Sequence, residues 1–325
     1  MTPRLAASAL LPLLALLALA SLLAALAAGS VALSPAELFA ALGGEPGLAR
    51  DVVLELRLPR ALTAFAVGGL LALAGALMQV LLGNPLADPY VLGVSGGAAV
   101  GALLALLLGV AGISVTAGAF FGALASIVLV FGLAHSRGER SPTRLLLTGV
   151  VMAAGWGAGI NLLLTLAPDA PLRGMLFWLM GDLSQAGFPG AGLAVLAVGV
   201  AATLPFARDL NLLARGELQA GALGVSVGRL RLHLYLVASL LTAAAVTLGG
   251  SIGFVGLIIP HLLRLLAGSD HRMLLPASVL AGGALLTAAD TLARTALAPQ
   301  QLPVGVLTAL LGVPVFLYLL TRSGR

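Results

Sequence analysis

Long uncharged apolar segments restrict this chain to membrane folds. The segment from Ala61 to Leu82 has no charged residue. At ~1.5 Å per residue, a helix of this length crosses a hydrocarbon core of ~30 Å. Comparable segments recur through the 325 residues, of which 60% are hydrophobic and 9% charged. Within lipid each backbone group needs a partner in its own helix, and these segments lack the alternation of β-barrel strands. We therefore expect an all-α, polytopic membrane protein.

The best-defined pair of spans is a hairpin around the sequence Asn84-Pro85-Leu86-Ala87-Asp88-Pro89. The prolines cannot donate backbone hydrogen bonds, so the first helix ends before them. Asp88 followed by Pro89 is typical of an N-cap and a first helical residue, which predicts that the second helix restarts there. Beyond it, Gly93, Gly97 and Gly101 are four residues apart and would let another helix pack closely.

The rest of the chain shows the same organisation, and residues 1–325 are expected to form a single transmembrane domain. The first apolar segment is longer than the ~7–15-residue core of a secretory signal, so we expect a retained helix, although Ala25-Leu26-Ala27 resembles a cleavage site. A short helix is expected from Pro35 and an amphipathic interfacial one over Met175–Leu183. The expected spans number about ten: Leu5–Ala28, Ala61–Leu82, one from Pro89, one ending near Leu133, Leu145–Leu166, Ala191–Phe206, Leu232–Leu248, Ile252–Leu266, Met273–Arg294 and Val304–Leu320.

The basic residues predict the orientation of this bundle. All 17 basic residues are arginine. With the N-terminus inside, twelve arginines fall at inner positions and five at outer ones, namely Arg50, Arg57, Arg60, Arg173 and Arg294. Because arginine and lysine favour cytoplasmic loops, both termini are expected to be cytoplasmic. The absence of lysine also excludes a GxxxxGK[ST] phosphate loop in this chain.

No catalytic or metal site is expected. The chain has no cysteine, and none of its four histidines shares a helix turn with a second ligand at zinc-site spacing. The scattered arginines lack the interleaved aromatics of a nucleic-acid surface, so no nucleic-acid partner is expected. Asp290 lies four residues before Arg294, which predicts a local ion pair; a proton relay through Asp290 is the alternative.

Two polar regions indicate contacts with other proteins. Arg57, Arg60 and Arg294 sit at outer ends of expected spans, where they would either form a basic patch for an acidic partner or reach lipid phosphates. The loop of about 208–231 is too long for a tight turn and carries regular apolar positions, so short helices joined by glycine turns are expected to dock in a partner's groove.

Many ordered blocks of this sequence resemble the permease subunits of ABC importers for vitamin B12, haem and iron-siderophores, the FecCD type. The matching blocks, which extend over nearly the whole chain, are Arg57–Arg60, Gly75–Gln79, Asn84–Pro89, Leu92–Ala98, Gly253–Arg264, Asp270–Arg272, Leu302–Gly305 and Gly312–Phe316. The resemblance implies ten transmembrane helices in a homodimer that works by alternating access in the bacterial inner membrane. It also implies two cytoplasmic ATPase subunits, which carry ATP and Mg²⁺, and a periplasmic binding protein. This chain would then hold no cofactor and perform no covalent chemistry.

The resemblance assigns three sets of positions. Arg57, Arg60 and Arg294 match arginines that pair with glutamates of the binding protein. The ATPase-coupling positions are Leu213, Gly216, Glu217, Ala220, Leu223, Gly224 and Val225, with Arg215 replacing a common leucine. The cytoplasmic gate matches Asn84, Leu86, Ser141 and Thr143, and Pro142 departs from the family pattern.

The substrate and two other functional classes stay open. Haem or another iron chelate is the favoured substrate, with cobalamin as the alternative. An ATPase-independent secondary transporter would show unpaired acidic residues in mid-helix or an inverted repeat, and neither is evident. An intramembrane enzyme would need a nucleophile with a base, or a metal site, facing a common cavity.

Overall fold

The computed structural model describes residues 7–29, 33–110, 113–135, 142–184, 187 and 189–323, and every regular element in them is a helix. Within these described residues, seven helical stretches are long and apolar enough to cross a membrane, and three shorter apolar helices bring the number to the predicted ten. The long stretches contain α1 (Ala7–Ala27), α4 (Leu58–Leu81), α6 (Ile113–His135), α7 (Pro142–Leu166), α9 (Gly190–Thr203) continuing into α10 (Ala207–Leu213), α12 (Val227–Gly249) and α14 (His271–Thr295). The shorter ones are α5 (Val94–Leu107), α13 (Val255–Ala267) and α15 (Val304–Ser323).

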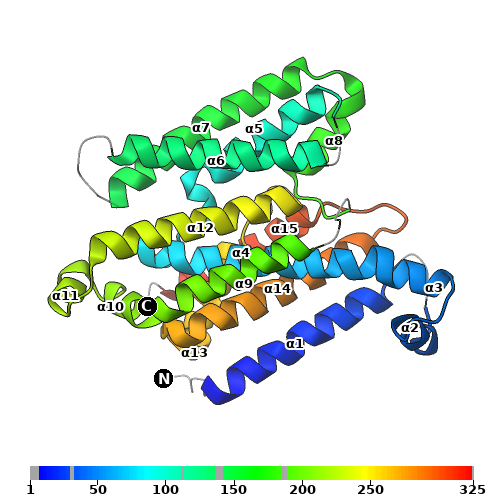
Figure 1. The fold of residues 1–325 in the computed structure, drawn as a ribbon, viewed down its shortest axis with the longest axis horizontal. Coiled ribbons are helices and arrows are strands. Elements are labelled where there is room, and N and C mark those ends of the chain that lie inside the picture. Colours follow the sequence, from blue (N-terminus) through cyan, green and yellow to red (C-terminus); the bar gives the residue numbers. More distant parts are fainter. Residues whose placement is uncertain are drawn as a thin grey trace.

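Helix α4 is the centre of the bundle. Every residue from Ala66 to Leu81 is buried, and α4 packs against α9, α12, α13 and α14. Gly68 faces the backbone of Gly282 on α14, and Gly75 faces the backbone of Gly256 on α13. Such small residues let helices approach closely. Helices α5, α6 and α7 lie as a separate group on the far side of α12 (Figure 1).

The hairpin after α4 differs in part from its prediction. The Asp88 carboxylate accepts a hydrogen bond from the Tyr90 N–H at 2.7 Å, as expected of a cap. The turn that follows, Pro89–Leu92, is a 3-10 helix ending at Gly93 with φ 71°, and α5 begins only at Val94. The sequence predicts one helix from Pro89 onward, but the left-handed backbone at Gly93 separates the 3-10 turn from α5. Gly97 and Gly101 face the backbones of Gly122 and Gly118 on α6, which confirms the predicted close packing.

The helix that leads into α4 also begins earlier than expected. A one-turn helix α3 (Leu48–Asp51) and a π-helical segment (Val52–Arg57) run without a break into α4. Within this junction the Leu58 N–H bonds to the Val53 carbonyl, five residues back, and Pro59 has no N–H to donate. A π-type turn accommodates this interruption of the α-helical hydrogen bonds.

The two short outer helices give one confirmation and one correction. Helix α2 (Pro35–Leu42) starts where predicted, because Ser34 and Glu37 form a reciprocal capping box. The interfacial helix was predicted over Met175–Leu183, but α8 spans Asp169–Leu179. It ends before Gly181, whose φ of 77° suits glycine and stops the helix.

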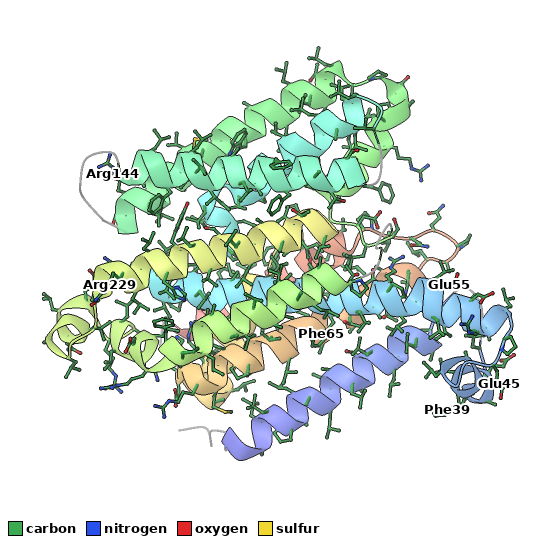
Figure 2. All side chains as sticks on the ribbon, in the orientation of Figure 1. Phe39, Glu45, Glu55, Phe65, Arg144 and Arg229 are labelled. Atoms are coloured by element: carbon green, nitrogen blue, oxygen red, sulfur yellow. The ribbon has the colours of Figure 1, made fainter. Side chains whose placement is uncertain are left out.

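The first and last helices show which end of the bundle is which. Helix α1 begins and α15 ends on the side that holds α10 and α11 (Glu217–Ala222), whereas α2 and α3 lie at the opposite end (Figure 1). Arg144 and Arg229 lie at the first end, and Glu45 and Glu55 at the second (Figure 2). The start of α1 and the end of α15 therefore lie on one side, and the cytoplasmic location of the two termini stays a prediction.

Candidate functional site

Arg60 forms the strongest polar contact at the end that carries α2 and α3. Its Nε donates to Asp290 Oδ2 at 2.9 Å and its Nη2 to Asp290 Oδ1 at 2.8 Å. Its Nη1 donates to Gln301 Oε1 at 2.8 Å. The side chain of Arg60 is 12% exposed and that of Asp290 3%. This two-point pair joins α4 to α14 with the geometry that arginine and carboxylate groups favour.

Arg57 and Arg294 bind the end of α1. Arg57 is 4% exposed, and its Nη1 donates to the carbonyls of Leu26 at 2.7 Å and Ala27 at 2.9 Å. Arg294 donates from Nη2 to the carbonyl of Ala25. The last carbonyls of a helix lack helical partners and carry partial negative charge, so two guanidinium groups satisfy and neutralise them.

These contacts bear on two predictions: the ion pair between Asp290 and Arg294, and the basic patch of the three outer arginines. The predicted ion pair between Asp290 and Arg294 is wrong, because Asp290 binds Arg60 on another helix and Arg294 turns to α1. The three outer arginines lie at one place in the bundle, because Arg57 and Arg294 bind neighbouring carbonyls of α1 and Arg60 pairs with Asp290, four residues before Arg294. One carboxylate pairs with one of them, which leaves an excess of positive charge. Arg60 and Arg294 are both partly exposed, whereas Arg57 is buried under α1. A docking role for the three arginines stays a prediction.

The coupling positions lie on α10, α11 and the turns beside them. Gly216 and Gly224 have φ of 124° and 88°, so both are glycine turns, as predicted. Leu213 and Ala220 are buried and hold the short helices to the bundle. Glu217 accepts from Arg231 Nη1 at 2.8 Å, Val225 packs on the core and Leu223 is 62% exposed. The predicted coupling residues therefore include buried side chains that anchor α10 and α11, glycines that form turns, and the exposed Leu223.

Sequence reasoning missed Leu218, which is 92% exposed on α11. It is the large apolar side chain with the greatest exposure among the described residues. Its position between Glu217 and Gln219 gave no sign of exposure, because the register of a one-turn helix depends on which neighbours it packs against. Leu218 near the start of α11 and Leu223 just after its last residue both expose apolar side chains.

Asn211 is a second residue that the sequence did not single out. Its Nδ2 donates to Asp270 Oδ1 at 2.8 Å. Its Oδ1 accepts from the His271 N–H at 2.9 Å and lies 2.7 Å from His271 Nδ1. The donated hydrogen bond is the main cause of a lowered pKa at Asp270, which also accepts from the Arg272 N–H as the N-cap of α14. We call these three residues the Asn211 contact.

The gate positions lie at the end where α4 finishes and α7 begins (Figure 1). Asn84 is exposed and its Oδ1 accepts from the Leu86 N–H at 2.9 Å, which shapes the turn after α4. Leu86 is partly exposed and Thr143 exposed at the start of α7. Ser141 lies outside the described residues. In the described part of this chain, the Asn84 side chain bonds only to this turn and not to Thr143, so a gate between them stays a prediction.

The comparisons with known proteins agree with one another. The FecCD transport family model matches residues 16–322. The cobalamin import system permease of Halobacterium salinarum is 47% identical over 281 residues, or 85% of this chain and 75% of that protein. The hemin transport system permease of Yersinia pestis is 44% identical over 83% of each chain. A solved inward-facing structure of an ABC transporter assigned to the metal-chelate type superposes with a TM-score of 0.84 at 32% identity, covering 98% of this chain and 100% of that one. The matched range contains Arg57, Arg60 and Arg294 as well as α10 and α11. A family model that covers nearly the whole chain, together with these relatives, shows that this chain belongs to the FecCD transport family of ABC importer permeases.

Proposed function

We propose that this permease moves haem or another iron chelate into the cell, with cobalamin as the alternative substrate. A separate ATPase powers the transport, and a binding protein delivers the substrate. The hemin and cobalamin permeases among its relatives support both substrates to a similar degree. The working unit is a homodimer in the bacterial inner membrane, with two ATPase subunits on the cytoplasmic side.

The exposed leucines of α11 are the observation that best supports a contact with a separate ATPase. Leu218 and Leu223 are 92% and 62% exposed, next to the rigid turns at Gly216 and Gly224. Leu218 is the most exposed large apolar side chain among the described residues, and two exposed leucines on one short helix at the end of the bundle support a protein contact there. The arginine-rich side holds this segment, which supports its cytoplasmic location.

The opposite end supports docking of a binding protein. Arg60 pairs with Asp290, whereas Arg57 and Arg294 bind uncharged carbonyls of α1, so the three arginines keep excess positive charge. Arg60 uses three of its five N–H groups on Asp290 and Gln301, and each terminal nitrogen retains one more. Arg60 is therefore the foremost contact for a glutamate, with Arg57 and Arg294 available only if they leave the end of α1.

Uptake into proteoliposomes tests the proposal. The vesicles contain this chain with its cognate ATPase, ATP inside and the binding protein outside, and receive haem, cobalamin or a ferric siderophore in parallel. We expect one compound to accumulate only when ATP, the ATPase and the binding protein are all present. Uptake that continues without the ATPase would contradict the proposal and favour a secondary transporter.

A further inference from the structure

The short helices of the coupling segment reach different transmembrane helices. Helix α10 packs against α14 and α11 against α12. Each of these contacts includes one polar link between side chains. Asn211 on α10 binds Asp270 and His271, and Glu217 on α11 binds Arg231 on α12. A force on α10 and α11 therefore has two polar routes into the membrane.

The Asn211 contact is the better built of the two routes. One amide bonds to both residues at the start of α14, and its orientation is defined because Nδ2 faces a carboxylate while Oδ1 faces a backbone N–H. Asp270 is exposed, as is the Glu217 side chain at 51%, but Asn211 also accepts from the N–H of His271, which is 1% exposed. The link from α10 to α14 therefore has two hydrogen-bonded partners, and the link from α11 to α12 has one.

A cavity leaves α10 and α11 without a continuous packed contact to α4. It has a volume of about 930 Å³, with Asn211, Arg215 and Glu217 on one side and Gln79, Leu82 and Pro85 on the other. Asp270 and His271 lie in its wall. The cavity provides room for α10 and α11 to move relative to the end of α4 and its gate turn. The Asn211 contact bridges the coupling segment to the bundle beside this space.

The far end of α14 bears the outer cluster. Asp290 binds Arg60 on α4, and Arg294 binds the end of α1. Helix α14 is continuous from His271 to Thr295, although Pro276 removes one helical hydrogen bond near its start. A displacement of the N-cap at Asp270 along the helix axis therefore reaches these outer contacts through one element. Helix α14 thus has a polar contact at each end, one facing the coupling segment and one facing the docking arginines.

We propose that Asn211 is a positioning residue of the transport cycle, which makes α14 follow the coupling segment during ATP hydrolysis. The inference rests on the proposed function, since it assigns an element of the ATP-driven movement. Asn211 touches neither substrate nor nucleotide in this role. It acts through α14, whose movement changes the inner and outer ends of the bundle together.

Exchanging the side chains of Asn211 and Asp270 tests whether Asn211 couples α14 to the coupling segment. Asn211→Asp places a carboxylate against Asp270 at the position of a 2.8 Å hydrogen bond, so the two groups repel at about pH 8. The double variant Asn211→Asp with Asp270→Asn restores one donor and one acceptor, and asparagine also serves as the N-cap of α14. Asn211→Leu removes the polar contact at similar size.

The readout is substrate accumulated per ATP hydrolysed, with haem and cobalamin offered separately to proteoliposomes. We expect the ratio to fall about tenfold in Asn211→Asp and Asn211→Leu, while the ATPase still binds and hydrolyses ATP. The exchanged double variant should recover at least about half of the original ratio. Tyr235→Phe is the matched control, because it loses one buried hydrogen bond, to the Ile127 carbonyl, between α12 and α6. It should lower stability without changing the ratio.

The outcomes separate this inference from the proposed function. An unchanged ratio in Asn211→Asp, or no recovery in a folded and assembled double variant, overturns the role of Asn211. A fall of the same size in Tyr235→Phe also overturns it, since general stability would then explain the effect. Absence of ATP-dependent uptake by the unaltered complex instead contradicts the proposed function.

Discussion

The two ends of the bundle present different surfaces to other proteins: the outer end has charged groups that are already hydrogen-bonded, and the coupling end has exposed leucines. At the outer end, the arginines are already bound by groups of this chain, namely Asp290, Gln301 and the last carbonyls of α1. At the coupling end, the leucines of α11 have no comparable cover, and Leu218 is 92% exposed. A partner at the outer end must therefore exchange or share existing polar contacts. A partner at the coupling end gains the burial of apolar surface.

This difference predicts two kinds of interface. Contacts between exposed charges weaken with salt and mainly govern the rate of association. Apolar burial is almost insensitive to moderate salt and suits a lasting assembly. The permease is thus expected to hold its ATPase through repeated cycles and to meet its binding protein transiently.

The largest expected effect is at the coupling end. Leu218→Asp should weaken binding of the ATPase by about 100-fold, as for a central apolar residue of an interface. It should leave the fold intact, because this side chain contributes little to the packing of its own chain. Co-purification and a binding titration in detergent or nanodiscs measure the effect.

The matched control for this variant is Leu48→Asp, at the other end of the bundle, where the leucine is 72% exposed. It should bind the ATPase normally. Equal loss of ATPase binding in both variants would refute the assignment of α11 as the coupling surface.

A smaller effect is expected at the outer end. The double variant Arg60→Gln with Asp290→Asn replaces the ion pair by two amides and so avoids an unpaired buried carboxylate. It should weaken docking of the binding protein by about 20-fold, because the carboxylate of the partner loses its guanidinium. Binding to nanodisc-held permease measures this loss.

Arg50→Gln provides the comparison at the same end, because the Arg50 side chain is 42% exposed and pairs only loosely with Asp51. We expect docking to change less than about twofold. If the double variant docks as well as Arg50→Gln does, Arg60 is not a docking contact.

The smallest effect concerns the junction between Arg57 and α1. A Cβ at Gly29 would lie 2.8 Å from Arg57 Cζ, so Gly29→Ala should push the guanidinium away from the carbonyls of Leu26 and Ala27. The loss of these hydrogen bonds should cost about 1–2 kcal/mol in the free energy of unfolding. Thermal unfolding in detergent detects the change.

Gly174→Ala on α8 is the control, because a Cβ there meets no atom within 4 Å. It should not lower stability. A Gly29→Ala variant as stable as this control would show that Arg57 does not hold α1.

Sequence patterns predicted the features that depend on local physics. Uncharged apolar segments predicted the ten spans, and Gly216 and Gly224 predicted the turns of the coupling segment. The misses depend on tertiary packing. Arg294 is the nearest cation to Asp290 along the helix, yet Arg60, 230 positions away, takes the carboxylate. The left-handed Gly93 and the early start before α4 likewise depend on how the helices meet.

The site residues divide in the same way. The family pattern singled out the three outer arginines, whose docking role stays a prediction, but it did not show that Arg57 is covered by α1. Asn211 carried no recognisable signal, because its partners Asp270 and His271 lie about 60 positions further along and meet it only in the folded bundle.

The most direct test of the account compares the salt dependence of the two interfaces in one preparation. Nanodisc-held permease is titrated with the ATPase and, separately, with the binding protein at about 0.05 M and about 0.5 M NaCl, a range over which the screening length falls several-fold. We predict that docking of the binding protein weakens by more than about tenfold, while ATPase binding changes by less than about twofold. Equal salt dependence at both ends, or the reverse order, would contradict the account.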